Sequence, residues 1–176
     1  MVLAPIGHYR RIRRLKYEDL NMLEGWDSDV EINRLTGRKF HETRVEDWWQ
    51  AIVRDRSRIG FAIMDDEGRL IGDVELEHIS WRIKEAELRI AIGDKTYWGR
   101  GFGTQAVLEV LHVAFDGMSL ERIYLRVQED NERAIRSYAK AGFKKIARLV
   151  ANGRLSGNTD LVLMEVIRDS ATLANG

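Results

Sequence analysis

The spacing of hydrophobic residues divides the N-terminal third of the chain into segments of different predicted structure. Residues 8–15 predict a first strand, and residues 16–26 then carry apolar side chains at helical spacing, which is typical of an amphipathic helix. Thr43 followed by Glu46 has the spacing of a capping box and predicts the start of a second helix. We therefore expect a strand followed by two helices in this part of the chain.

The period of the hydrophobic pattern then changes from 3.6 to 2. Residues 60–64, 70–79 and 85–92 alternate between apolar and polar side chains, and a turn of Asp, Asp, Glu and Gly separates the first two runs at 65–68. This pattern predicts an antiparallel meander of three strands.

The second half of the chain returns to helical spacing and then to alternation. The predicted elements are a helix over 103–116, a strand over 122–127, a helix over 131–141 closed by a left-handed Gly142, and a hairpin of 143–149 with 160–167. No linker, repeat or block of like charge interrupts the order. We therefore expect one domain over residues 1–176.

Composition excludes several classes of function. Lys plus Arg and Asp plus Glu both count 28, so the formal net charge is zero and gives no reason to expect a nucleic acid partner. The sequence has no Cys, and its four His show no ligand-like spacing, so we predict no metal site and no thiolate nucleophile. No apolar run reaches the roughly 18 residues of a membrane helix, and the N-terminus has no signal-peptide core. We expect a cytoplasmic protein that binds no membrane.

The candidate chemistry begins with a glycine-rich segment between a predicted strand and a predicted helix. Gly99, Gly101 and Gly103 allow a tight turn whose N–H groups are not covered by side chains, and the helix N-terminus adds unpaired donors. This combination is typical of a pyrophosphate cradle, although a glycine-rich loop can equally be structural. A P-loop would need Lys and Ser or Thr after the glycines, and a dinucleotide fold would need a parallel βαβ unit. Both nucleotide-binding alternatives are therefore disfavoured.

Two motifs in the right order resemble those of the GNAT acetyltransferases. Segment 98–103 reads Trp-Gly-Arg-Gly-Phe-Gly and is similar to the family's glycine loop, with Trp98 where the family more often has Gln or Arg. Segment 131–143 matches the second motif, Asn-x-x-Ala-x-x-x-Tyr-x-x-x-Gly-Phe. The resemblance implies an α+β fold with a twisted, mostly antiparallel central sheet, splayed middle strands and helices on both faces.

Three shorter segments resemble one branch of this family. The strand at 74–76, the residues 86–88 and the late turn at 152–154 look like the branch that contains spermidine and ribosomal-protein N-terminal acetyltransferases. The whole resemblance is weakest over 28–44.

The resemblance also implies a set of residues that hold acetyl-CoA. Segment 100–104 should bind the pyrophosphate, 90–92 should pair with the pantetheine arm like an added strand, and Asn131 should hydrogen-bond that arm. Asn131 is also in a position to cap its own helix. The full predicted set is Ile90, Ala91, Ile92, Trp98, Gly99, Arg100, Gly101, Phe102, Gly103, Thr104, Asn131, Arg133, Ala134, Ser137 and Tyr138.

Two kinds of side chain are candidates for catalysis. By the resemblance, Tyr138 would be the general acid that protonates the departing CoA thiolate, while its spacing alone also fits a buried structural tyrosine. An attacking alkylamine is mostly protonated at neutral pH, so a base must accept its proton. Glu87 is the first candidate and Glu75 the second. The alternative is one polar sheet face held by cross-strand charge pairs, made of Asp73, Glu75, Glu77, Glu87 and Arg89.

Together these features predict an N-acetyltransferase that uses acetyl-CoA and transfers the acetyl group by direct attack in a ternary complex. The acceptor is a primary amine, either a small amine such as a polyamine or the α-amine of a protein N-terminus. The alternative is a catalytically silent acyl-CoA-binding regulatory domain. The late hairpin and the exposed edge of a splayed sheet offer a contact for a homodimer.

Overall fold

A mixed sheet of seven strands forms the centre of the part of the protein that the structure describes. The computed structural model describes residues 9–36, 45–150 and 160–168. The strands are β1 (Ile12–Arg14), β2 (Ile59–Met64), β3 (Leu70–Ser80), β4 (Glu85–Ile92), β5 (Arg122–Gln128), β6 (Lys144–Leu149) and β7 (Leu161–Ile167). They lie in the order β1-β2-β3-β4-β5-β7-β6, and every neighbouring pair is antiparallel except β4 with β5. The expected meander and the late hairpin are therefore confirmed.

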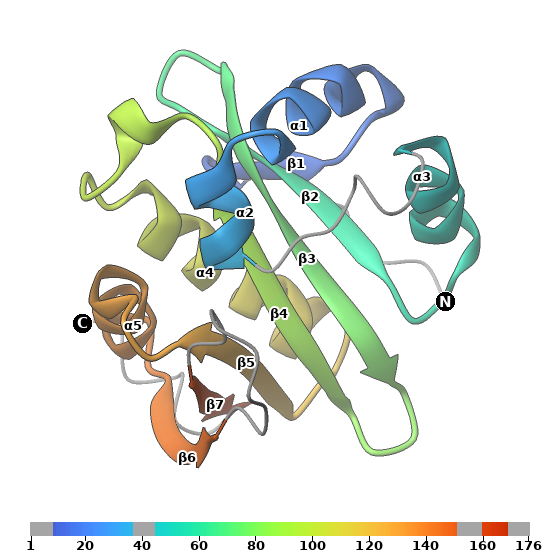
Figure 1. Cartoon of the computed structure of the whole chain (residues 1–176). Helices are drawn as coiled ribbons and strands as arrows, with labels where there is room; N and C mark the ends of the chain where they lie inside the picture. The colour runs from blue at the N-terminus through green and yellow to red at the C-terminus, as the bar shows by residue number, and fades with distance from the viewer. Residues whose placement is uncertain (1–8, 37–44, 151–159, 169–176) are drawn as a thin grey trace.

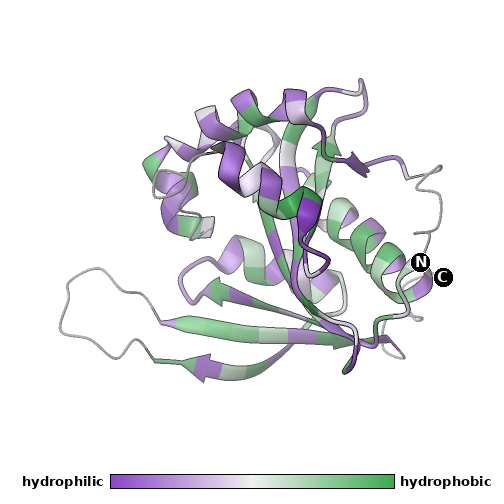
Figure 2. Cartoon of the chain, turned by 90° about the vertical axis from the view of Figure 1, so that its right-hand side faces the viewer, coloured by the Kyte–Doolittle hydropathy of each residue, from purple (hydrophilic) through white to green (hydrophobic). Residues whose placement is uncertain are grey.

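Helices cover both faces of this sheet, as expected. The helical elements are η1 (Tyr17–Asp19), α1 (Leu20–Asp27), α2 (Val30–Thr36), α3 (Val45–Arg54), η3 (Lys95–Tyr97), α4 (Phe102–His112), the π-helical turn η4 (Val113–Gly117) and α5 (Glu132–Lys140). In Figure 1, α1, α2 and α3 lie in front of the strands and α4 lies behind them. Figure 2 shows the strands from the side, between these two groups of helices.

Each face of the sheet has its own apolar cluster. The larger cluster packs α4, η4 and the end of α5 against the sheet, with Phe61, Leu76 and Leu125 almost fully buried. The smaller one joins Trp48 of α3 to Leu23 of α1 and to β2. In the described parts of the chain, no helix is long and apolar enough to cross a membrane.

The N-terminal third differs from the prediction in two places, and a third prediction lies outside the described residues. The first strand covers only Ile12–Arg14 of the described residues, rather than 8–15. An additional helix, α2, begins after Asp29, whose carboxylate accepts the N–H groups of Glu31 (3.0 Å) and Ile32 (3.1 Å), and it buries Ile32 against the core. Thr43 of the predicted capping box lies outside the described residues.

Elements of the second half lie close to their predicted positions. The expected helix over 103–116 is α4, which ends at His112 and continues as the π-helical turn η4. Gly142 has φ of 97°, so it is the left-handed residue expected after α5.

Strands β4 and β5 pair over only three positions before they separate. The parallel register joins Glu85 to Arg122, Ala86 to Ile123 and Glu87 to Tyr124. Both strands then continue, β4 to Ile92 and β5 to Gln128, without further pairing between them. The separation leaves backbone groups of both strands without a ladder partner, which confirms the expected splayed strands and creates the site described next.

Candidate active site

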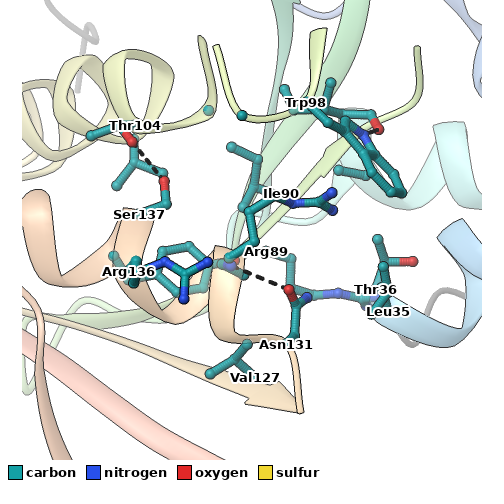
Figure 3. A pocket seen from close by; sticks show the side chains of 18 of the residues that line it. Leu35, Thr36, Arg89, Ile90, Trp98, Thr104, Val127, Asn131, Arg136 and Ser137 are labelled. Carbon is teal, nitrogen blue, oxygen red and sulfur yellow. Dashed lines mark hydrogen bonds between the residues drawn. The ribbon is translucent and has the colours of Figure 1, made fainter. Parts of the chain in front are cut away.

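A cavity of about 360 Å³ lies where β4 and β5 separate. Its walls are Leu88 to Ile92 of β4, Arg126 and Val127 of β5, the start of α4, and the first turns of α5, while α2 closes one side. Figure 3 shows these elements converging from four directions on one space. The cavity therefore brings together the two sequence motifs, which are some thirty residues apart in the chain.

The glycine loop forms one end of this cavity. Gly99 and Gly101 have φ of 75° and 87°, a left-handed conformation that favours glycine, and Gly101 is the N-cap residue of α4. No side chain caps the N-terminus of α4, and a Cβ at Gly101 would meet nothing within 4 Å. The first N–H groups of α4 are therefore open to a ligand, which fits the phosphate groups of a CoA ester.

Cationic side chains of α5 line the same end. Arg133, Arg136 and Lys140 all border the cavity, and they add positive charge beside the helix N-terminus. The Arg133 guanidinium lies 3.7 Å from the centroid of the Trp98 ring, and Trp98 Nε1 donates to the carbonyl of Ile92 at 2.8 Å. Trp98 therefore connects the glycine loop to both β4 and α5.

One polar contact joins α5 to α4, and another caps the N-terminus of α5. The hydroxyl oxygens of Thr104 and Ser137 lie 2.7 Å apart across the two helices. Asn131 accepts a hydrogen bond from the Ala134 N–H at 3.2 Å, so its side chain caps α5 while it also borders the cavity (Figure 3). The helix-capping interpretation of Asn131 is thus confirmed.

Tyr138 projects from α5 into the cavity lining. Its ring packs against Phe143 at a centroid distance of 5.9 Å, and burial raises the pKa of its phenol above the ordinary value. Within the described residues the hydroxyl has no hydrogen-bond partner. A protonated hydroxyl is therefore available to a group that enters the cavity.

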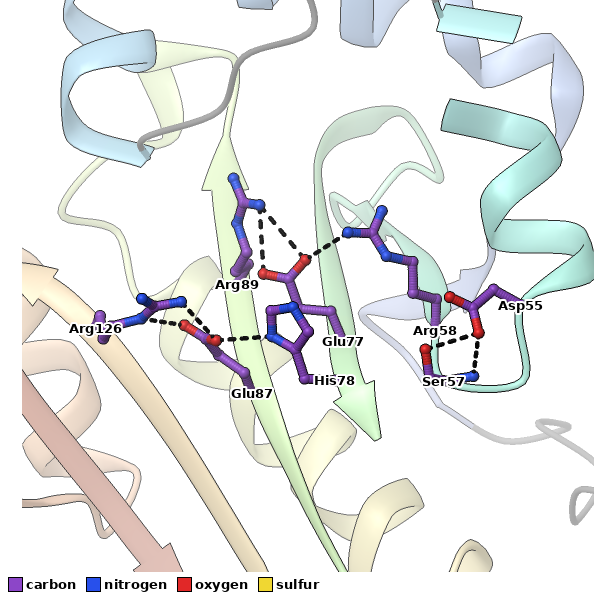
Figure 4. A network of polar contacts seen from close by, with 8 residues as sticks. All are labelled: Asp55, Ser57, Arg58, Glu77, His78, Glu87, Arg89 and Arg126. Atoms are coloured by element: carbon purple, nitrogen blue, oxygen red, sulfur yellow. Dashed lines mark hydrogen bonds and ion pairs between the residues drawn. The ribbon is translucent and has the colours of Figure 1, made fainter. Parts of the chain in front are cut away.

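The proposed base Glu87 lies beside the cavity but is not part of its lining. Its side chain is buried, and Arg126 donates to its two oxygens at 2.8 Å each (Figure 4). Burial alone would raise the pKa of the Glu87 carboxyl, but the hydrogen bonds and charges of Arg126 and His78 together lower it below the ordinary value. Glu87 is therefore ionised at neutral pH and firmly held.

The polar sheet face predicted as the alternative is also present. Arg89 of β4 donates to Glu77 of β3 at 3.3 Å, and Arg58 donates to the same carboxylate at 3.1 Å. Glu75 is 4% exposed on this face and does not line the cavity. Cross-strand charge pairing is thus one role of this face.

The comparison with known proteins identifies the family. The family model described as an acetyltransferase (GNAT) domain matches residues 10–144. The chain belongs to the GNAT acetyltransferases.

Relatives extend this likeness over most of the chain. The spermidine N(1)-acetyltransferase of Escherichia coli (strain K12) is 30% identical over 155 residues, which cover 87% of this chain and 82% of that protein. The spermidine N(1)-acetyltransferase of Vibrio cholerae is 26% identical over 148 residues, which cover 83% and 85%. A crystal structure of spermidine N-acetyltransferase from Vibrio cholerae in complex with CoA and spermine has a TM-score of 0.83 at 25% identity, covering 92% of this chain and 96% of that one. This GNAT enzyme is therefore an N-acetyltransferase that uses acetyl-CoA as its acetyl donor.

Most residues predicted to hold acetyl-CoA line the GNAT cavity, and two do not. Phe102 is buried under the glycine loop, with its ring 5.1 Å from that of Tyr97, and Arg100 is exposed, with its guanidinium 5.1 Å from the centroid of Tyr97. In segment 100–104, the side chains of Arg100 and Phe102 thus lie outside the cavity, while Gly101, Gly103 and Thr104 border it. The residues that do line it are Ile90, Ala91, Ile92, Trp98, Gly99, Gly101, Gly103, Thr104, Asn131, Arg133, Ala134, Ser137 and Tyr138.

Sequence reasoning did not single out several residues that line the cavity, among them Arg126 and Tyr97, nor His78, which contacts Glu87 beside it. Arg126 lines the cavity and holds Glu87, and its place in the alternating strand 122–127 was the available signal. Tyr97, which also lines the cavity, donates its hydroxyl hydrogen to Asp65 at 2.8 Å. His78 carried no signal, because its direction is set by a shift in the register of β3 with β4 between Glu77 and Ser80.

Proposed function

We propose that the acceptor of this N-acetyltransferase is a primary amine of a polyamine, with spermidine as the first compound to test. The observation that carries the proposal is the extent of the likeness to a spermidine N-acetyltransferase whose structure holds CoA and spermine, since it covers 92% of this chain. The described sheet face beside the cavity supports it, because Asp73, Glu75, Glu77 and Glu87 place carboxylates there. Carboxylates favour a cationic acceptor over an anionic one, even where arginines neutralise part of their charge.

On the donor side, we assign the phosphate groups of acetyl-CoA to the N-terminus of α4 and to the cations of α5. Backbone groups of Ile90 to Ile92 are the partners for the pantetheine arm, because β4 keeps its pairing with β3 there but has no neighbour on the side where it leaves β5. The Ile92 carbonyl already accepts from Trp98, so the remaining groups of this segment carry the pairing. Bound acetyl-CoA supplies the activated acetyl thioester.

We assign the general acid to Tyr138. Its phenol is protonated, lines the cavity and has no competing partner among the described residues, so it can give its proton to the sulfur that leaves. Direct attack by the amine needs no nucleophile from the protein. The cavity between the separated strands lets the amine approach from the polar face while the thioester enters from the side of α4 and α5.

Three finer predictions remain part of this proposal. We expect the chain to fold as one domain and to act in the cytoplasm. β6 lies at the edge of the sheet and exposes Ile146 and Leu149, which supports the predicted homodimer through the late hairpin. Light scattering of the purified protein would measure the dimer directly.

The test is release of free thiol from acetyl-CoA in the presence of an amine panel. The panel contains spermidine, an aminoglycoside, free amino acids and peptides that match ribosomal-protein N-termini, and each reaction is repeated with Tyr138→Phe. We expect spermidine to be the fastest acceptor and the variant to be roughly tenfold slower or more.

Other outcomes discriminate between the alternatives. Turnover restricted to the peptides would replace the polyamine by a protein α-amine. Binding of CoA without turnover on any amine would instead favour the silent regulatory domain. Tyr138→Phe with full activity would remove Tyr138 from the mechanism.

A further inference from the structure

His78 has a backbone conformation that a strand residue does not normally adopt. Its φ is 53°, and the register of β3 with β4 shifts between Glu77 and Ser80, which marks a β-bulge. The N–H of Ile79 leaves the ladder and donates to the carbonyl of Ser57 at 3.0 Å. Strain of this kind is retained where the surrounding structure fixes it, often at functional sites.

The bulge changes the face to which His78 belongs. Strict alternation would place His78 on the core face with Leu76, but both Glu77 and His78 lie on the polar face, and Ile79 returns to the core. The His78 side chain is 58% exposed, and its Nδ1 lies 3.1 Å from Oε2 of Glu87 (Figure 4). A residue that alternation would bury is therefore presented to solvent beside the point where β4 and β5 separate.

The contact with Glu87 fixes the tautomer of the imidazole. Because Glu87 is ionised and accepts only, Nδ1 must carry the hydrogen of this bond. In the neutral ring, Nε2 then carries the free lone pair and can accept a proton. Arg126 completes the chain of contacts, since it borders the cavity and holds both oxygens of Glu87.

Charges of both signs surround this imidazole. Glu77 and Glu87 lie beside it, and Asp55 in the turn before β2 is close enough for the His78 charge to lower the pKa of its carboxyl. The guanidiniums that balance them are those of Arg58, Arg89 and Arg126. A positive charge on the imidazole therefore lies near carboxylates on three segments, which compensates the charge that proton transfer would create.

We propose that His78 is the proton acceptor for the attacking amine, directly or through one water, and that Glu87 is its positioning residue. The inference deepens the proposed function and rests on it. An amine that enters as an ammonium ion loses one proton to Nε2, attacks the thioester carbonyl, and loses a second proton when the amide forms. The carbon–sulfur bond breaks, the sulfur takes the Tyr138 proton, and the phenol recovers one of the two protons from the amine. The other proton leaves through His78 to solvent, so the reaction releases one proton for each amide formed.

A metal site is the competing interpretation of the same cluster. One ligand atom each of Glu77, His78 and Glu87 lie within 4.8 Å of one another. However, both carboxylates already pair with guanidiniums, so a cation would have to displace Arg89 or Arg126. Paired carboxylates of this kind favour the proton-acceptor interpretation.

The experiment replaces the imidazole without disturbing the bulge. His78→Gly suits a φ of 53°, and His78→Asn is a second variant that tolerates the left-handed conformation. For both variants, kcat/KM of the amine is measured from pH 6 to 10 at saturating acetyl-CoA, with and without added imidazole. The amine used is the one that the wild-type enzyme acetylates fastest in the panel. If that amine is not spermidine, the polyamine proposal fails, but the role of His78 can still be tested.

We expect His78→Gly to lose about 100-fold in kcat/KM of the amine, with little change in the KM of acetyl-CoA. In its pH profile, the wild-type acidic limb should be replaced by a rate that rises steadily up to about pH 10, because only the neutral fraction of the amine can then attack. Imidazole should restore at least part of the rate, because the site is open to solvent. Glu87→Gln should also be slow, without rescue by imidazole, because its defect is orientation. Retention of the wild-type acidic limb in either His78 variant, or a loss that imidazole does not reverse, would overturn the proposal. So would loss of wild-type activity in EDTA that Zn²⁺ restores.

Discussion

Replacement of Gly101 by alanine tests whether the glycine loop is preorganised for its ligand. Gly101 has φ of 87° and a Cβ there would meet nothing within 4 Å, so alanine introduces a conformational cost without a clash. A left-handed alanine costs about 1–2 kcal/mol. Without ligand, the alanine loop can relax to a conformation without this strain. Binding of acetyl-CoA then has to return residue 101 to the left-handed conformation, at the same free-energy cost. We therefore expect the affinity for acetyl-CoA to fall by about 5- to 30-fold.

Isothermal titration calorimetry measures this change, and thermal unfolding of the same sample shows that the fold is intact. The matched control is Gly25→Ala, because a Cβ at Gly25 also meets nothing within 4 Å but lies in α1 with an ordinary φ. The control should keep its affinity and gain about 0.5–1 kcal/mol of stability from helix propensity. Equal affinities of Gly101→Ala and the wild type would refute the argument that the left-handed residue positions the N–H groups.

Three further predictions concern stability and pH. Glu109→Ala should lower the free energy of unfolding by about 2–3 kcal/mol in urea denaturation, because the Glu109 carboxylate accepts the N–H groups of residues 10–12; Glu109→Gln should lose less. Gly93→Ala should destabilise by about 1–3 kcal/mol in thermal unfolding, because its Cβ would lie 1.9 Å from Cδ2 of Trp26; an unchanged melting temperature would contradict the packing there. Burial raises the pKa of Tyr138, so the phenol stays protonated at every pH below its ordinary value near 10, and kcat should show no alkaline loss from pH 8 to about 10. An alkaline limb that Tyr138→Phe removes would contradict this last prediction.

The elements that sequence predicted well are those whose signals are local. The meander of β2, β3 and β4 follows from side chains that alternate between two faces, and Gly142 ends α5 because a left-handed residue is needed there. The glycine loop and the second motif converged on one cavity, since each is a contiguous segment with its own backbone requirements. Residues whose partners lie nearby in the chain could therefore be placed correctly.

Other features depend on partners that are distant in the chain. α2 covers only seven residues, too few for a clear helical period, although Asp29 was a local signal for its start. The insertion of β7 between β5 and β6 depends on pairing across the sheet rather than on either strand alone. Such features need tertiary contacts before they become visible.

The position of the proton acceptor shows most clearly why a pattern of residues cannot replace a structure. Sequence alternation correctly placed Glu87 on the polar face, but it could not show that Arg126, 39 positions away on the parallel neighbour, holds both carboxylate oxygens. A carboxylate in that state is a weaker base than a free one, and its hydrogen bond to His78 instead prepares the imidazole to accept a proton. The bulge turns His78 out of the face that alternation predicts. The alternation that placed Glu87 correctly therefore assigned His78, its hydrogen-bond partner, to the wrong face.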